Sequence, residues 1–282
     1  MKSILKGYKR QKNGPRHVWW RYALALPILA VYVTPFYILL GVAFKMSNDP
    51  SGRWILPGYL YLENFRVALA GKILPGIRDS LVITVCAVAL IVIVGGFAAY
   101  PLARNKSRLN TLVKRFILGI MMVPPLSILV PIYSVMLTLD AISTYHGIIL
   151  LIVTFALPLS VFIFTNFIAS IPVTLDEAAY IDGCGPVRTF FSIIMPQLAP
   201  VTTSIVILTG VRAWNDYQFS LYMLQSPRIT SVTLAVSGFF AQVSSNVHAA
   251  AAAATLGVLP VIALFLLLQR YFIQGMVDSA IK

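Results

Sequence analysis

Six apolar runs, each long enough to cross a lipid bilayer as a helix, dominate this sequence. A hydrocarbon core about 30 Å thick needs about 20 helical residues to span it. Of the 282 residues, 59% are hydrophobic and only 11% are charged, so a water-soluble fold would lack the polar residues to cover its surface. We therefore predict an all-α membrane protein with one membrane domain at residues 22–282, whose spans lie near 22–43, 81–102, 116–137, 147–167, 201–222 and 250–272.

The basic residues are divided unevenly between the two ends of these spans. Fifteen of the 22 lysines and arginines fall on one side, while six fall on the other and Arg212 lies inside a span. By the positive-inside rule, both termini and the connection 171–200 are cytoplasmic. This distribution explains the net charge of +13 without a nucleic-acid partner. We interpret residues 1–21 as a retained basic cytoplasmic segment, because the apolar run after it is longer than that of a signal peptide.

The connection 171–200 predicts two short helices joined by a glycine turn. Thr174 and Glu177 have the spacing of a capping box, in which each side chain satisfies a backbone donor at the start of a helix. Gly183 stands where a left-handed C-terminal cap would fall, a conformation that costs other residues about 1–2 kcal/mol. The first helix is therefore expected to stop at Asp182.

The second short helix is expected to begin at once. Gly185 suits the N-cap, and Pro186 suits the first helical position, where a missing N–H costs nothing. Pro196 is expected to end the helix. Its apolar residues recur at i, i+3, i+4 and i+7 and are Val187, Phe190, Phe191 and Ile194. A cytoplasmic helix would not expose such a face, so we expect a partner to cover it, with the phenylalanines as anchors.

The spacing within this connection resembles the EAA loop of ABC importer permeases. The family pattern is EAA, three residues, G, nine residues, I, one residue, then LP, and it is matched here by Glu177, Ala178, Ala179, Gly183, Ile193, Met195 and Pro196, with Met195 in place of leucine. In that family the loop is cytoplasmic and docks into a groove on the ATP-hydrolysing subunit. The resemblance implies an ATPase-coupling role for Glu177, Ala178, Ala179, Gly183, Val187, Phe190, Phe191, Ile193 and Pro196. The alternative is an interfacial or re-entrant hairpin without a partner.

Three further stretches resemble the carbohydrate-uptake branch of this family, which includes the maltose-type permeases. They are Pro124-Pro125 with Pro131 in the third span, Trp214-Asn215-Asp216 in the fifth, and the Q-R-Y-F sequence 269–272 in the last. Prolines can break a transporter helix and expose its backbone to the pathway, although a kink that serves only packing is an equal alternative.

The fifth span holds a polar cluster within the membrane region. Arg212 and Asp216 are four residues apart and would share a helix face, so we expect them to pair, since an unpaired charge in a bilayer costs a few kcal/mol. We expect Asn215 to face the translocation pathway, and Trp214 to offer an apolar plate for a sugar ring. The alternative is that the cluster lies near a helix end and its charged groups reach the aqueous interface.

The resemblance implies a six-span permease subunit of an ABC type I importer in a prokaryotic plasma membrane, multi-pass and surrounded by lipid. It also implies a second homologous permease, two ATPase subunits that bind the ATP, and an extracytoplasmic sugar-binding protein. Closure of the ATPase pair would rock the bundle between inward-open and outward-open states.

The chain shows no P-loop, no H-E-x-x-H and no G-x-S-x-G motif, and its three histidines are scattered. We therefore predict no catalytic residue, no metal site and no cofactor in this chain. Two alternatives stay open: import of polyols or glycerol phosphodiesters within the same class, where Arg212 would attract an anion, and, in a different class, a secondary transporter or a membrane enzyme.

Overall fold

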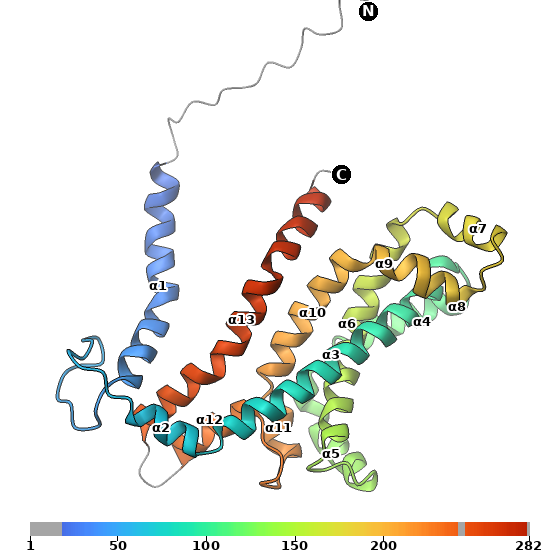
Figure 1. Cartoon of the computed structure of the whole chain (residues 1–282). Helices are drawn as coiled ribbons and strands as arrows, with labels where there is room; N and C mark the ends of the chain where they lie inside the picture. Colours follow the sequence, from blue (N-terminus) through green and yellow to red (C-terminus); the bar gives the residue numbers. More distant parts are fainter. Residues whose placement is uncertain (1–18, 242–245, 281–282) are drawn as a thin grey trace, which may run out of the picture.

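The computed structural model describes residues 19–241 and 246–280, so most of the predicted segment 1–21 lies outside the described residues. The described chain is built from helices (Figure 1). In order they are α1 Trp19–Ala43, α2 Glu63–Ala70, α3 Ile73–Arg104, α4 Arg108–Ile120, the 3₁₀ turn η1 Pro125–Ile128, α5 Leu129–Thr138, α6 Tyr145–Ser170, α7 Thr174–Ile181, α8 Pro186–Thr189, the π turn η2 Phe190–Ile194, α9 Met195–Gln197, α10 Ala199–Trp214, α11 Gln218–Met223, α12 Val232–Ala241 and α13 Val247–Ala280.

Four of the described helices, α1, α3, α6 and α13, are long and apolar enough to cross a membrane, and the number rises to six if each of two bent helix pairs forms one span. The expected spans 22–43, 81–102, 147–167 and 250–272 each fall within one of the four long helices. The third expected span, 116–137, is interrupted, since the chain bends by 93° between α4 and the segment Pro125–Thr138.

The proline pair explains this break. Pro125 opens η1, and Pro124 before it is extended, with φ −66° and ψ 127°. A residue that precedes a proline is driven out of the helical region, so α4 cannot continue into α5.

The fifth expected span, 201–222, is also interrupted. α10 stops at Trp214, and α11 begins only at Gln218. At its other end, α10 makes an angle of 79° with the Pro186–Gln197 segment, and Leu198 lies between them. The fifth span is therefore a long helix followed by a break and a short helix.

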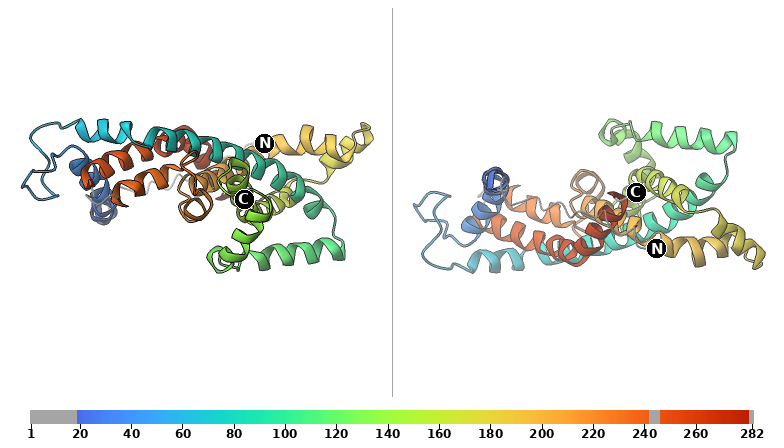
Figure 2. Two further views of the ribbon diagram at one scale, coloured as in Figure 1. Left: turned by 90° about the horizontal axis from the view of Figure 1, so that it is seen from below. Right: turned by 90° about the horizontal axis from the view of Figure 1, so that it is seen from above.

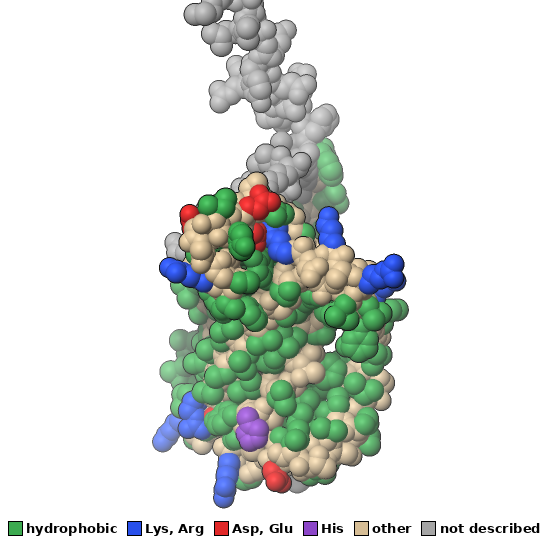
Figure 3. All heavy atoms as spheres, turned by 90° about the vertical axis from the view of Figure 1, so that its right-hand side faces the viewer, with side chains coloured by type: hydrophobic (Ala, Val, Ile, Leu, Met, Phe, Trp, Pro, Cys, Tyr) green, Lys and Arg blue, Asp and Glu red, His purple; other side chains and the backbone are tan. Residues whose placement is uncertain are grey.

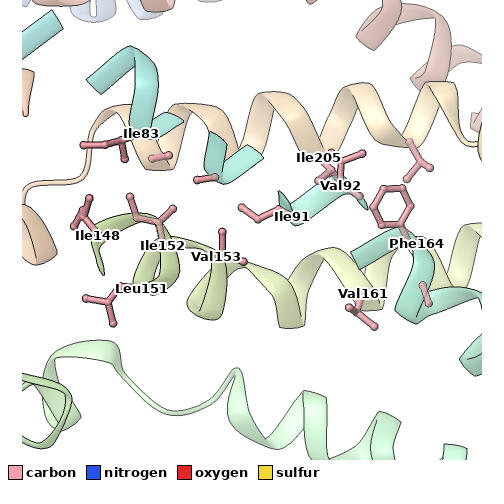
Figure 4. Close-up of a cluster of buried hydrophobic side chains, with 14 of the residues drawn as sticks. Ile83, Ile91, Val92, Ile148, Leu151, Ile152, Val153, Val161, Phe164 and Ile205 are labelled. Carbon is pink, nitrogen blue, oxygen red and sulfur yellow. The ribbon is translucent and has the colours of Figure 1, made fainter. Parts of the chain in front are cut away.

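The main hydrophobic core lies between α3, α6 and α10. α3 packs along α6 more extensively than any other pair of elements, and aliphatic side chains from both fill the space between them (Figure 4). Ile91, Phe164 and Ile205 contribute one buried side chain from each of the three helices. This core also includes the π turn η2 of the second short helical segment, because Phe190 and Ile194 belong to the same cluster.

A second core lies at the opposite end of the elongated outline seen in Figure 2. It joins the last residues of α1 to α2, α12 and the first turns of α13, where the first five of six consecutive alanines, 249–254, are buried and let helices approach closely. Most of the remaining described side chains of α1 are exposed within this chain.

The charged residues lie mainly at the two ends of the molecule. Seen from the side that carries α4, α7 and α8, apolar side chains cover the middle, while basic and acidic side chains gather above and below (Figure 3). The start of α1, the end of α13 and the α7–α8 loop lie at the same end (Figure 1).

Candidate coupling surface and translocation pathway

The start of α7 differs from the expected capping box. The N-cap position is Val173, which has helical backbone angles, and Thr174 is already the first helical residue. The N–H groups of Asp176 and Glu177 donate to the Val173 carbonyl at 2.9 and 3.1 Å. A backbone turn thus satisfies donors that the threonine hydroxyl was expected to satisfy, and the capping-box prediction is wrong.

The end of α7 confirms the expected glycine turn. Asp182 is the C-cap, and Gly183 has φ +77°. Gly183 N–H donates to the Tyr180 carbonyl at 3.0 Å, and Cys184 N–H donates to the Ala179 carbonyl at 2.9 Å. These two bonds form a Schellman motif, which satisfies the last carbonyls of the helix.

The second short helix begins as expected but ends later. Gly185 is its N-cap, with φ −72° and ψ 163°, and Pro186 occupies its first turn. Pro196 does not end it, because the chain passes through the π turn and α9 to Gln197. Pro196 lies in the first turn of α9, directly after the π turn.

The expected apolar face is divided between the inside and the outside. Phe190 and Ile194 are fully buried, and the Phe190 ring lies 5.4 Å from the Phe97 ring and 5.6 Å from the Tyr100 ring of α3. The prediction that a partner subunit covers Phe190 is therefore wrong, because this side of the helix packs against the membrane domain. Phe191 is 46% exposed although it stacks on Phe97.

The exposed part of the loop forms a different surface, which we call the coupling surface and define as Glu177, Ala178, Tyr180, Ile181 and Val187. Tyr180, Ile181 and Val187 are 81%, 84% and 57% exposed. Glu177 is exposed and has no hydrogen-bond or ion-pair partner among the described residues. Of the remaining expected residues, Ala179 is buried, Ile193 is half-buried and Pro196 is exposed.

A polar network that the sequence analysis missed holds α7 against the membrane domain. The Asp176 carboxylate lies 2.7 Å from the Arg104 guanidinium and accepts a hydrogen bond of 2.5 Å from the Tyr100 hydroxyl. Arg104 also donates to the Ile168 and Ile171 carbonyls at 3.1 and 2.9 Å, at the end of α6. The sequence signal was the acidic residue directly before the E-A-A motif, but its partner lies 72 positions earlier.

At the break in the fifth span, Asn215 is exposed and Trp214 is buried. The Trp214 indole N–H donates to the Gly257 carbonyl of α13 at 3.0 Å. Asn215 is the C-cap of α10, and its side-chain amide donates to the Val211 carbonyl at 2.9 Å. Trp214 therefore ties two helices together, and the expectation that it offers a plate for a sugar ring is wrong.

The predicted pair of Arg212 and Asp216 does not form. One Asp216 carboxylate oxygen accepts from the Ser220 N–H and hydroxyl, both at 2.8 Å, and the other accepts from the Phe219 N–H at 3.3 Å. The four-residue spacing brings side chains together only within one continuous helix, and α10 stops before Asp216. The aspartate caps α11 instead, and Arg212 is exposed without an ion-pair partner among the described residues.

A second buried acid, which the sequence analysis did not single out, lies at the other end of α3. Asp79 is fully buried. It accepts from Arg78 at 2.8 Å, from the Tyr145 hydroxyl of α6 at 2.8 Å and from the Thr230 N–H at 3.0 Å. Asp79 thus joins three parts of the chain. Among the residues that the structure describes, no three His, Cys, Asp or Glu side chains are grouped to hold a metal ion.

Comparison with known proteins agrees with this arrangement. Residues 81–278 match the family of binding-protein-dependent transport system inner membrane components. The chain is 40% identical to the melibiose/raffinose/stachyose import permease protein MelC of Bacillus subtilis, over 92% of this chain and 95% of that protein. It is 29% identical to the multiple sugar-binding transport system permease protein MsmG of Streptococcus mutans, over 96% of this chain and 100% of that protein.

A solved structure shares the fold. One chain of a bacterial ABC transporter involved in the import of the acidic polysaccharide alginate superposes with a TM-score of 0.77 at 18% identity, over 94% of this chain and 99% of that chain. The family match covers more than half of the present sequence. The chain therefore belongs to the inner-membrane permease components of binding-protein-dependent ABC importers.

Proposed function

We propose that this chain is one of two permease subunits of a sugar importer, that it forms half of the translocation pathway, and that it is driven by separate ATPase subunits. The observation that carries the proposal is the similarity, along 92% of the chain, to a permease named for the import of melibiose, raffinose and stachyose. Sugar passes through such a subunit without any bond being made or broken, so the chain needs no catalytic group.

The coupling surface is the part of the molecule suited to receive the ATPase. Tyr180, Ile181 and Val187 expose apolar side chains at the end of the molecule that carries both described chain ends. We assign this end to the cytoplasm, because the basic residues are concentrated there. Glu177 adds a carboxylate that has no partner among the described residues and that a basic residue of the ATPase can bind.

The network around Asp176 transmits movement of this surface. Arg104 holds Asp176 and also the last turn of α6, so a pull on α7 moves α3 and α6 together. Phe190 packs against α3, so a pull on the second short helix also moves α3. ATP-driven closure of the ATPase pair therefore moves the main core as one body, which is a rigid-body switch.

Asn215 and Arg212 are the residues we assign to the pathway. A sugar that leaves water must exchange its hydrogen bonds for protein ones, since each unsatisfied polar group in hydrocarbon costs several kcal/mol. Both side chains are exposed at the interruption of the fifth span, where a broken helix brings polar groups to a cavity.

The test is purification from native membranes in mild detergent, followed by identification of the co-purifying chains and uptake assays in proteoliposomes. We expect a second permease, an ATPase and an extracytoplasmic binding protein, with uptake of labelled melibiose or raffinose that requires ATP. Uptake driven by an ion gradient without an ATPase would identify a secondary transporter. Uptake of glycerol phosphodiesters but of no sugar would contradict the proposed substrate class.

A further inference from the structure

A small pocket lies between α4 and α6, away from the coupling surface and from the break in the fifth span. Its volume is about 120 Å³. One part of its wall is polar and formed by Lys114, Thr165 and Asn166, and the rest is apolar, with Ile117, Val161 and Phe162 among the lining residues. None of the described residues that line it is acidic.

Thr165 is the residue that points to a ligand. It is only 7% exposed, and its hydroxyl oxygen is buried without a hydrogen-bond partner among the described residues. Elsewhere on α6, Thr154 and Ser160 satisfy their hydroxyls on the carbonyl four residues earlier, at 2.7 and 3.0 Å. Thr165 lacks this bond although it lines the pocket, and a buried hydroxyl without a partner is unfavourable.

Lys114 supplies a positive charge at the wall of the pocket. It is half-buried and has no hydrogen-bond or ion-pair partner in the part of the chain that the structure describes. The neighbouring basic residues Arg108 and Arg115 are exposed on the same helix. A lysine next to an unpartnered hydroxyl, in a pocket without an acid, is complementary to an anion.

The position of the pocket fits a lipid head group. Thr165 lies five residues before the end of α6, and Lys114 lies six residues after the start of α4, so at 1.5 Å per residue both are about 8 Å from helix ends. These are the ends that we assign to the cytoplasm, where the leaflet carries anionic lipids. α4 exposes Leu109, Leu112 and Phe116, as expected of a basic amphipathic helix at a lipid boundary.

We propose that this pocket binds the phosphate group of an anionic phospholipid of the inner leaflet. Lys114 pairs with the phosphate, the Thr165 hydroxyl donates to one of its oxygens, and Asn166 supplies a further donor at the rim. Phe162 and Ile117 contact the adjoining acyl chain. The site links the α4–α5 segment to α6 through a lipid rather than through a direct polar contact.

The experiment uses the full chain, purified with whatever subunits accompany it and incorporated into nanodiscs of neutral phosphatidylcholine with or without 30% phosphatidylglycerol. Native mass spectrometry of the released complex measures how many phosphatidylglycerol molecules stay bound. Lys114→Gln and Thr165→Val remove the charge and the hydroxyl. Arg115→Gln is the matched control, because it removes the same charge from the exposed side of the same helix, and Lys114→Arg tests whether charge alone restores binding.

We expect the native chain and the R115Q and K114R variants to retain at least one phosphatidylglycerol, K114Q to lose about tenfold in retention and T165V to lose several-fold. Equal retention by native chain and K114Q, or equal retention of phosphatidylcholine, would overturn the proposal. Displacement of the lipid by millimolar inorganic phosphate would show that a soluble anion is the occupant. Absence of any bound lipid, with a cross-link from position 114 to another subunit, would show that a protein fills the pocket.

Discussion

At the scale of single residues, backbone conformation decides more than side-chain chemistry. Gly183 was predictable from sequence, because a left-handed cap after a short helix needs a residue without a Cβ. The role of Asp216 was not predictable, because its hydrogen-bond partners depend on where α10 stops. The sequence does not mark that point, since apolar residues continue past it within 201–222. The same aspartate would pair with Arg212 in a continuous helix and caps α11 in the broken one.

Gly183→Val should reduce uptake severely while the membrane domain stays folded. The space around Gly183 is open, with no atom within 4 Å of an added Cβ, so the cost is the positive φ alone, about 1–2 kcal/mol. That strain misaligns α7 with α8. The measurement is ATP-dependent uptake together with the amount of ATPase retained, and Gly185→Ala, at an equally open position with ordinary φ, is the control that should behave normally.

Asn215→Leu should lower sugar uptake and leave the amount of assembled complex unchanged, because the side chain is exposed. Asp216→Leu should instead lower the assembled amount, because it removes the cap of α11, worth about 0.5–2 kcal/mol. Size-exclusion yield and uptake measured on both variants separate the two roles. A fully assembled Asp216 variant without transport would move the aspartate into the pathway.

At the scale of elements, the spacing of apolar residues predicts helices but does not predict which part of the protein packs against their apolar faces. Val187, Phe190, Phe191 and Ile194 were correctly placed on one helical segment. The pattern could not tell a face that meets a partner from one that meets α3 of the same chain, since both are apolar. The π turn also rotates this face relative to a regular helix.

Phe190→Asp should reduce the yield of folded membrane domain, because it buries a charge against Phe97 and Tyr100, and loss of a buried phenylalanine alone costs about 3–5 kcal/mol. Val187→Asp should leave the fold intact and weaken ATPase retention. Co-purification of the ATPase, normalised to folded permease, is the measurement. Full ATPase retention by the Val187 variant would exclude this part of the coupling surface.

Asp176→Asn should uncouple ATP hydrolysis from uptake. It keeps an acceptor for the Tyr100 hydroxyl but leaves the Arg104 guanidinium, only 14% exposed, without its counter-charge, a loss of about 3 kcal/mol for a buried pair. The ratio of ATP hydrolysed to sugar imported should rise. Asp182→Asn, a change of the same charge at the exposed end of α7, should leave this ratio unaltered.

At the scale of the whole molecule, the composition alone established an all-helical membrane protein, and the spacing of the E-A-A motif indicated the family. The contacts between distant segments could not be predicted. Asp79 lies just outside the expected span 81–102, and no motif in the sequence marks it. Its partners, Tyr145 and Thr230, are 66 and 151 positions away. Only the folded structure therefore shows that Asp79 connects three segments of the chain.

Asp79→Ala should destabilise the whole membrane domain, because the Tyr145 hydroxyl and the Thr230 N–H lose their acceptor in a buried site. Removing one member of a buried charged network costs about 3–5 kcal/mol. Thermal unfolding in detergent should show a clearly lower midpoint. Glu63→Gln breaks only an exposed ion pair with Arg66 and should leave the midpoint unchanged.

The packing of α1 has a consequence for how the protein is made. α1 precedes every other described helix in the chain, yet it packs mainly against α13, which follows all the others. During synthesis α1 must therefore stay in the lipid bilayer without its packing partner, and its apolar surface makes this possible. The second core can therefore close only after α13 has been synthesised, and truncation of α13 should leave α1 inserted but undocked.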